Sequence, residues 1–385
     1  MFKNPIPYGR QEITEADIEA VITTLKSDFL TQGPRIKEFE DKFATYIGCR
    51  YAVAVANGTA ALHLSAMALG VNSKSRVITT PITFAASANC ILYCGGSVEF
   101  VDIDPVSFTI DIDKLEGLLK QYPKGYYQGI VPVDFAGYPV DTERLRKIAD
   151  EYGLWILEDA CHAPGGYFYN AKKEKTNCGD GRYSDLSIFS FHPVKHIASG
   201  EGGMITTNDE ALYKRLLNIR THGINKNFSA PPEGQGGWYY EMTELGYNYR
   251  LPDILCSLGI TQLARAESNL IKRRKIADIY SAALTGLAPG IKIPQYPAGH
   301  AFHLYVIRTE KRLALYDFLH SRNIFTQVHY IPVHTLPYYQ GLGFKKGSMP
   351  EAEKYYEECL SLPMYPSITK EEHEYVIACI MEFFS

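Results

Sequence analysis

The first half of the chain alternates short apolar runs with segments of helical periodicity. Seven such runs lie between Ala52 and Thr207, and they are Ala52–Ala56, Val77–Thr80, Ser97–Val101, Gly129–Val133, Leu154–Leu157, Leu186–Phe191 and Met204–Thr207. Strands that are apolar on both faces and alternate with helices are typical of a mostly parallel sheet that helices cover on both sides. The sequence therefore predicts an α/β fold with a seven-stranded, mostly parallel sheet sandwiched by helices.

One helical segment carries clear start and stop signals. The segment Asp141–Tyr152 opens with Asp141, whose carboxylate can accept backbone N–H groups of the first turn, and is followed by Gly153. We expect a helix that begins at the cap Asp141 and ends at Gly153.

The pattern changes after the predicted sheet. Residues Asn227–Tyr240 are rich in glycine, proline and aromatic residues and predict an ordered loop. Pro252 fits the first turn of a helix, and the helical pattern then continues to Leu284. Short strands and helices follow. We therefore expect a large domain with an N-terminal arm over residues 1–250 and a smaller C-terminal α+β domain over 251–385.

Composition narrows the class of protein. The chain has 385 residues, 46% of them hydrophobic and 21% charged, and a net charge of −4 without a long run of like charge. We expect no nucleic-acid or membrane partner. The eight cysteines are scattered without a C-x-x-C pair, which favours reduced cysteines in a cytosolic protein. No apolar stretch reaches the roughly 18 residues of a membrane span, so a cytoplasmic location is expected.

A turn of small residues follows the first predicted strand. In Asn57-Gly58-Thr59 the turn opens a helical segment, whose first backbone N–H groups and dipole would face an anion. Gly58 lets the backbone approach a ligand closely, and Thr59 adds a hydroxyl. The turn is a candidate phosphate cup, although many strand-to-helix turns without a ligand look similar.

Asp159 stands just past the apolar run Leu154–Leu157, where its carboxylate would face the crevice at the carboxyl ends of the strands. A buried acid needs a cationic partner. A protonated pyridine nitrogen is one candidate, and an arginine elsewhere in the chain is the other.

Lys195 lies between an alternating strand that ends at Pro193 and the glycine-rich segment Gly200–Gly203. Most lysines are solvated surface residues, but this position places the amine in a partly desolvated crevice. Desolvation lowers the pKa of a lysine and makes it a usable nucleophile. Ser190, near the end of the same strand, adds a further hydroxyl for a phosphate.

Phe84 follows another strand end and is placed either to stack on a flat ring or to pack in the core. Together the four features describe one cofactor. A flat, cationic, phosphorylated ring aldehyde needs a lysine for a Schiff base, an acid for the ring nitrogen, an aromatic face and a phosphate cup. The combination predicts pyridoxal 5'-phosphate (PLP).

Further motifs extend this pattern over nearly the whole chain. They are Pro7-Tyr8-Gly9-Arg10, Leu30–Pro34, Gly246–Leu251, Gln327–Tyr330, Ser361–Pro363 and S-F-H-x-x-K-x-x-x-x-x-E-G-G around Lys195. With these motifs the chain resembles the sugar aminotransferases of the DegT/DnrJ/EryC1/StrS family, which belong to fold type I of the PLP-dependent transferases. The motif around Lys195 is highly specific for that family.

The resemblance implies a role for each candidate residue. Lys195 would hold PLP as a Schiff base and act as general base, and Asp159 would bind the pyridine nitrogen. His162 would lie near the ring hydroxyl, and Phe84 would pack on the ring face. The residues implied to hold the phosphate are Gly58, Thr59, Ser190 and, across the interface of a homodimer, the partner subunit's Asn248. His329 and Tyr330 are candidates for contacting the substrate.

Within the family the chain looks most similar to the subgroup of the pseudaminic-acid pathway, on Phe191–Lys195, Glu244–Arg250 and Gln327–Tyr330. This subgroup aminates C4 of a UDP-linked 4-keto-6-deoxy-N-acetyl hexose. The expected partners are therefore a nucleotide-linked keto-sugar and L-glutamate, which leaves as 2-oxoglutarate, with pyridoxamine phosphate as the intermediate form of the cofactor. The chain departs from the subgroup at His196–Ser199, usually Pro-Ile-Thr-Thr-like, and at Asn57–Thr59, often Ser-Ala-Thr.

Several alternatives remain beside this hypothesis. The sugar could be linked to dTDP or GDP. Dehydratases of the same fold carry a histidine in place of the lysine, which Lys195 disfavours even though His196 stands beside it. A nicotinamide-dependent oxidoreductase would need a G-x-G-x-x-G after the first strand, which is missing. A catalytically inactive binding protein is disfavoured because Lys195 and Asp159 are both present.

Overall fold

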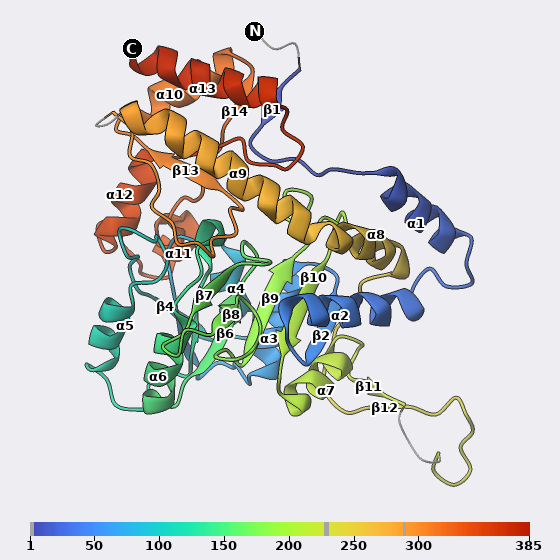
Figure 1. Cartoon of the computed structure of the whole chain (residues 1–385). Coiled ribbons are helices and arrows are strands. Elements are labelled where there is room, and N and C mark those ends of the chain that lie inside the picture. Colours follow the sequence, from blue (N-terminus) through green and yellow to red (C-terminus); the bar gives the residue numbers. More distant parts are fainter. Residues whose placement is uncertain (1–3, 227–230, 288–289) are drawn as a thin grey trace.

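A seven-stranded sheet forms the centre of the protein (Figure 1), in a computed structural model that describes residues 4–226, 231–287 and 290–385. Its strands are β2 (Tyr51–Val55), β3 (Arg76–Thr79), β4 (Ser97–Phe100), β5 (Gly129–Val131), β6 (Trp155–Asp159), β9 (Leu186–Ser190) and β10 (Gly203–Thr207). Each strand overlaps one of the seven predicted runs. The spatial order is β2-β10-β9-β6-β5-β3-β4, and only β10 is antiparallel to its neighbours. The predicted mostly parallel sheet is confirmed.

Helices cover both faces of the sheet because successive strand residues are buried on opposite sides. The helices on one face are α3 (Gly58–Ala68), α4 (Ala86–Tyr93) and α7 (Glu210–Ile219). Those on the other are α2 (Pro34–Ile47), α5 (Ile112–Leu119), α6 (Thr142–Tyr152) and α8 (Asp253–Ala264). For α6 the predicted signals hold: the Asp141 carboxylate accepts from the Arg144 N–H at 2.9 Å, and Gly153 ends the helix with a φ of 71°.

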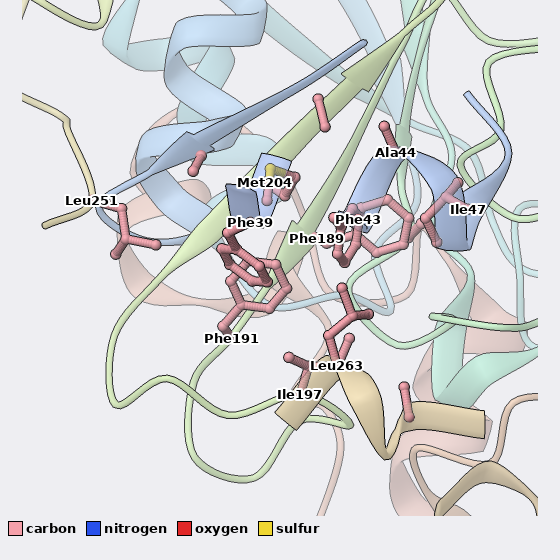
Figure 2. Close-up of a cluster of buried hydrophobic side chains, with 14 of the residues drawn as sticks. Phe39, Phe43, Ala44, Ile47, Phe189, Phe191, Ile197, Met204, Leu251 and Leu263 are labelled. Atoms are coloured by element: carbon pink, nitrogen blue, oxygen red, sulfur yellow. The ribbon is translucent and has the colours of Figure 1, made fainter. Parts of the chain in front are cut away.

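An aromatic cluster fixes the strand that leads to Lys195 (Figure 2). Phe43 of α2 packs on Phe189 of β9 with ring centroids 5.0 Å apart, and Phe39 packs on Phe191 at 5.1 Å. All four side chains are fully buried. Edge-on and tilted aromatic pairs of this kind add about 0.5–1.5 kcal/mol each beyond area burial. The end of β9 is thus held firmly from the α2 side.

The long helix predicted after Pro252 is two helices, α8 and α9 (Ala266–Leu284), and that prediction of a continuous helix is wrong. Pro252 itself is the N-cap residue, one position before the first turn. The break falls at Arg265, with a φ of −104° and a ψ of 0°. It arises because α8 packs on α1 (Glu15–Leu25) and α2, whereas α9 packs on the C-terminal helix.

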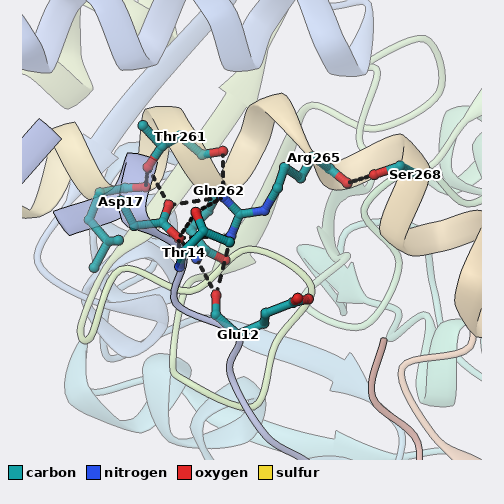
Figure 3. Close-up of polar contacts among 8 residues, drawn as sticks. Glu12, Thr14, Asp17, Thr261, Gln262, Arg265 and Ser268 are labelled. Carbon is teal, nitrogen blue, oxygen red and sulfur yellow. Dashed lines mark hydrogen bonds and ion pairs between the residues drawn. The ribbon is translucent and has the colours of Figure 1, made fainter. Parts of the chain in front are cut away.

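A polar network ties the N-terminal segment to the break in the helix (Figure 3). The buried Asp17 of α1 accepts from Arg265 Nη2 at 2.8 Å and from Thr261 Oγ1 at 2.5 Å, and Thr14 caps α1. Burial by itself would raise the pKa of Asp17, but the hydrogen bonds from Arg265, Thr261 and Thr14 outweigh it, and the pKa is lowered. Asp17 is therefore a buried carboxylate with a matched cation.

The C-terminal part has a small core of its own. Its remaining elements are α10 (Arg312–Ser321), α11 (Pro337–Gly341), α12 (Pro350–Glu358), α13 (Lys370–Phe384) and the antiparallel strands β13 (Tyr305–Arg308) and β15 (Cys359–Leu362). The N-terminal strand β1 (Ile6–Pro7) pairs in parallel with β14 (Ile324–Phe325), so the arm packs on this part of the chain. The division at residue 250 stays a prediction.

Two further hairpins complete the described structure, β7 (Tyr167–Tyr169) with β8 (Lys175–Asn177) and β11 (Ile224–Asn225) with β12 (Glu241–Met242). Of the predicted loop, residues 227–230 lie outside the described residues, and 231–240 contain no helix or strand. Within the described ranges, no helix is both long and apolar enough to cross a membrane. The eight cysteines are free, five of them buried and three half-buried.

Candidate active site

The candidate residues gather where β2, β6 and β9 end and the antiparallel strand β10 begins. In β10, Gly203 pairs with both Val55 and Ser190, so the start of this strand abuts two strand ends at once. This is the edge at which open α/β sheets bind ligands.

Lys195 follows β9 and is half-buried at this edge of the sheet. Its Nζ atom lies 3.5 Å from Nε2 of His303. Burial lowers the pKa of the amine, and the negative charge of Asp159 opposes part of that shift. The amine is therefore partly desolvated, as the glycine-rich context predicted, and is easier to deprotonate than an ordinary lysine.

Asp159 is the last residue of β6, and only 6% of it is exposed. Its Oδ2 accepts from Ser87 Oγ at 2.6 Å, and its Oδ1 accepts from the Cys161 N–H at 3.2 Å. Ser87 is held in turn by Thr83, whose Oγ1 is 2.7 Å away. In the described part of the chain no arginine bonds to Asp159, so the arginine alternative gains no support. The carboxylate keeps free acceptor capacity for a cation.

The turn Asn57–Thr59 has the geometry of an anion cup. Asn57 caps α3 by accepting the Ala60 N–H at 2.8 Å, and the helix begins at Gly58. The first turn of a helix leaves further N–H groups for a ligand. The hydroxyl-bearing residues Thr59 and Ser190 are both half-buried.

Two glycines in the walls of this turn leave no room for a side chain. A Cβ atom added at Gly58 would lie 3.0 Å from Cβ of Ser190, and one added at Gly203 would lie 2.5 Å from the carbonyl oxygen of Asn57. Side chains at these positions would therefore fill the cradle or push its walls apart. Gly203 lets the start of β10 lie close to the Asn57–Gly58 backbone, whereas the approach of a ligand to Gly58 stays a prediction.

Phe84 is 64% exposed, so it is not a core residue. Its ring centroid lies 6.2 Å from that of Tyr330, which comes from the C-terminal part. A large exposed aromatic face beside a crevice is available to stack on a planar ligand.

His162 links the sheet to Tyr330. Its Nδ1 accepts from the backbone N–H of Ala136 at 3.2 Å, so the neutral ring carries its hydrogen on Nε2, which lies 3.3 Å from Tyr330 Oη. Burial, followed by the charge of Lys195, lowers the pKa of His162 well below its ordinary value. Burial raises the pKa of Tyr330. Both groups are therefore neutral and serve as fixed hydrogen-bonding groups.

The His329 ring packs edge-on against Tyr330 with ring centroids 4.9 Å apart, whereas Asn248 lies on a separate segment. His329 is 6% exposed, and its Nδ1 is 2.8 Å from Ser361 Oγ, so its ring points inward. Burial and then the charge of Lys195 lower its pKa to about 3. Asn248 is exposed, in a segment whose backbone bridges Thr221 and runs beside the end of β2.

Sequence reasoning missed two residues of this site, Ser87 and His303. Ser87 had a weak local signal, because it stands four positions after Thr83 in the segment that follows a strand end. His303 had none, since it reaches Lys195 from the segment before β13.

The residues present fit PLP. The half-buried hydroxyls at the N-terminus of α3 suit a phosphate, the Asp159 carboxylate suits a cationic ring nitrogen, and the partly desolvated Lys195 amine suits a Schiff base. A Cβ atom at Gly58 would press against Ser190, so the start of α3 lies close to the end of β9 and brings the two phosphate candidates together.

Comparison with known proteins agrees with this geometry. Residues 11–381 match the DegT/DnrJ/EryC1/StrS aminotransferase family. Spore coat polysaccharide biosynthesis protein SpsC of Bacillus subtilis is 37% identical, over 98% of this chain and 96% of that protein. UDP-4-amino-4,6-dideoxy-N-acetyl-beta-L-altrosamine transaminase of Campylobacter jejuni serotype O:2 is 36% identical, over 96% of this chain and 95% of that protein.

One similar protein has been solved in a cofactor-bound form. The putative sugar aminotransferase Spr1654 of Streptococcus pneumoniae in its pyridoxamine-phosphate form superposes with a TM-score of 0.89 at 29% identity, covering 98% of this chain and 99% of that one. The chain therefore belongs to the DegT/DnrJ/EryC1/StrS aminotransferase family and is a PLP-dependent sugar aminotransferase.

Proposed function

We propose that this enzyme transfers the amino group of L-glutamate to C4 of a UDP-linked 4-keto-6-deoxy-N-acetyl hexose, in nucleotide-sugar biosynthesis of the pseudaminic-acid type. The main support for transamination is the state of the Lys195 amine, which is partly desolvated and interacts with the charge of Asp159. The name of the Campylobacter jejuni relative and the motif Gln327–Tyr330 support the choice of sugar. A dTDP- or GDP-linked keto-sugar is the alternative, because SpsC is equally similar and its name specifies no nucleotide.

Lys195 and Asp159 would carry the chemistry. PLP, when bound, supplies an electron sink for proton removal at the carbon that bears the amino group. Lys195 would hold the cofactor, and its free amine would move that proton, because burial has made the amine easier to deprotonate. Asp159 keeps a positive charge on the ring nitrogen, and Ser87 orients the carboxylate.

The surrounding residues would bind and orient. The residues assigned to the phosphate are Gly58, Thr59, Ser190 and the partner subunit's Asn248. Phe84 covers the ring, and His162 lies beside its hydroxyl. Tyr330, which is hydrogen-bonded to His162, and the neighbouring His329 would contact the substrate.

A panel of UDP-, dTDP- and GDP-linked keto-sugars tests the proposed acceptor. Each sugar is incubated with the holoenzyme and L-glutamate, and the product is identified by NMR. We expect 4-amination of the UDP-linked 4-keto-6-deoxy-N-acetyl hexose at the highest kcat/KM. A strong preference for a dTDP- or GDP-linked sugar would reject the proposed substrate and leave the aminotransferase activity intact.

The cytoplasmic enzyme would act as a homodimer with shared sites, each completed by Asn248 of the other chain. The exposure of Asn248 supports this role, since its side chain is available to a second copy. A two-fold dimer would form both sites at once.

Subunit complementation tests the shared site. Lys195→Ala and Asn248→Glu chains, each nearly inactive alone, are mixed and allowed to exchange subunits. In a mixed dimer with shared sites, one site carries both defects and the other carries neither, so activity partly returns. If Asn248 serves its own chain, every site in the mixture stays defective and no activity appears.

A further inference from the structure

His303 lies between the Lys195 amine and two other histidines. Its Nε2 atom is 3.5 Å from Lys195 Nζ, and its ring centroid is 4.2 Å from that of His162 and 5.7 Å from that of His196. Only 3% of His303 is exposed. Because it precedes β13 while Lys195 follows β9, this contact joins the C-terminal part of the chain to the end of the central sheet.

The backbone of His303 is anchored by a buried arginine. Arg273, which is 1% exposed, donates from Nη1 to the carbonyl oxygens of Met364 at 2.9 Å, Phe302 at 3.2 Å and His303 at 3.4 Å. One guanidinium therefore fixes the segment that carries His303 to the segment after β15. The backbone that carries His303 is therefore fixed, and the ring is held by packing, since its Nδ1 has no hydrogen-bond partner among the described residues.

The three histidines are neutral. Burial lowers the pKa of His303 well below its ordinary value, and the positive charge of Lys195 acts in the same direction. Burial also lowers the pKa of His196, whose Nε2 carries its hydrogen because it lies 2.8 Å from the carbonyl oxygen of Ala301. An imidazole this hard to protonate is a poor base, so a proton in transit stays with the Lys195 amine.

We propose that His303 is a positioning residue for Lys195, accepting a hydrogen bond from the free amine and thereby fixing the direction of the amine's lone pair. The proposal rests on the proposed role of Lys195. With Nε2 as the acceptor, the neutral ring of His303 carries its hydrogen on Nδ1. An amine that donates one N–H to His303 has fewer orientations for its lone pair, which must face the carbon that loses a proton. A contact of 3.5 Å is long for a hydrogen bond, and such contacts in active sites tighten when substrate is bound.

Two substitutions separate the hydrogen bond from the packing of the ring. His303→Phe keeps a buried ring and removes the acceptor, whereas His303→Gln keeps an acceptor of similar reach. If phenylalanine is not tolerated, His303→Leu removes the same acceptor with a smaller side chain. His300→Phe is the matched control, because His300 is buried nearby but bonds to the Phe302 N–H at 2.9 Å and not to Lys195.

The first measurement uses the cofactor-free protein and needs no turnover. Lys195 is acetylated competitively with acetic anhydride as a function of pH, and its labelling is read by peptide mapping. We expect His303→Phe to lower the apparent pKa of Lys195, since an acceptor that stabilises the ammonium form is lost. His303→Gln should restore the profile, and His300→Phe should leave it unchanged. An unchanged profile in His303→Phe would overturn the proposal.

The second measurement is the half-reaction with L-glutamate in a single turnover. We expect His303→Phe to slow it by roughly tenfold to a hundredfold at an unchanged Kd for glutamate, the range expected when a reacting group is misplaced. His303→Gln should recover most of the rate. Equal losses in both variants would also overturn the proposal. Failure of the proposed role of Lys195 is distinguishable, because borohydride reduction of the holoenzyme would then label another lysine.

Discussion

Glu158 and Asp159 are consecutive residues at the end of β6, and their buried carboxyl groups have opposite surroundings. They point to opposite faces of the sheet because strand side chains alternate. Glu158 is surrounded by fixed donors, accepting from Ser184 Oγ at 2.9 Å, from Ser187 Oγ at 2.8 Å and from the Gly179 N–H at 3.0 Å. Asp159 accepts from Ser87 and one backbone N–H and lies on the side of the sheet edge where its charge acts on Lys195.

The neighbouring charges differ as well. Glu158 faces Asp134, which is 0% exposed and whose Oδ2 has no hydrogen-bond partner in the described part of the chain. Burial raises the pKa of both acids, and the charge of Glu158 raises that of Asp134 further. Asp159 instead feels the positive charge of Lys195. The comparison teaches that burial alone does not set the state of a carboxyl group. On the core side of β6, the raised pKa values of Glu158 and Asp134 favour a protonated acid. On the other side, the Asp159 carboxylate has acceptor capacity left for a cation.

The largest effect that separates the two faces is expected for Asp159→Asn. The neutral amide can no longer hold a cationic ring nitrogen, and one such electrostatic contact contributes about 2.7–4 kcal/mol to a transition state. We expect the half-reaction with L-glutamate to slow by roughly 100- to 1000-fold while PLP still binds, measured by stopped-flow absorbance. Asp113→Asn, a change at an exposed carboxylate, is the control. A rate within about twofold of wild type would show that Asp159 has another role.

Much of this arrangement follows from local sequence. The seven strands were visible as apolar runs, and the cup at Gly58 and the crevice residue Lys195 were visible because each follows such a run. The break at Arg265 and the contact of His303 with Lys195 were not visible, since both depend on which distant segments pack together. Asp134 was missed for the same reason: its proximity to Glu158 depends on the pairing of neighbouring strands, which local patterns do not encode.

A smaller effect is expected from Ser87→Ala, which removes the donor to Asp159 and keeps the carboxylate. A hydrogen bond to a charged group contributes about 1.5 kcal/mol or more, which corresponds to about tenfold in rate. We therefore expect the half-reaction with L-glutamate to slow by about tenfold. Circular dichroism should show that the fold of the variant is unchanged. Ser65→Ala is a matched control, because Ser65 is equally buried but its hydroxyl has no partner among the described residues. Equal rates in the two variants would show that Ser87 does not orient Asp159.

The smallest effect concerns the core face and is a change in stability with pH. The folded protein keeps a proton on the Asp134 and Glu158 pair at pH values where the unfolded chain has released it, because the pKa of each acid is raised by folding. The folded state therefore binds more protons, and the free energy of unfolding falls as pH rises above the ordinary carboxyl range. The stability that this pair contributes is fully present below the ordinary carboxyl pKa values. It is lost as the pH rises through the raised pKa values of the folded protein.

Asp134→Asn should remove much of this pH dependence. The new amide is uncharged at every pH, so no acid remains at that position to be ionised, and its N–H can donate to the nearby Glu158 carboxylate. We expect the variant to gain about 1 kcal/mol over wild type near pH 8, the scale of one buried hydrogen bond, and little near pH 5. Urea unfolding midpoints of the holoenzyme at the two pH values measure the difference, with Asp113→Asn again as the control. A loss of the same size at both pH values would mean that Asp134 is ionised in the folded protein, and the contrast between the two faces of β6 would then rest on hydrogen bonds alone.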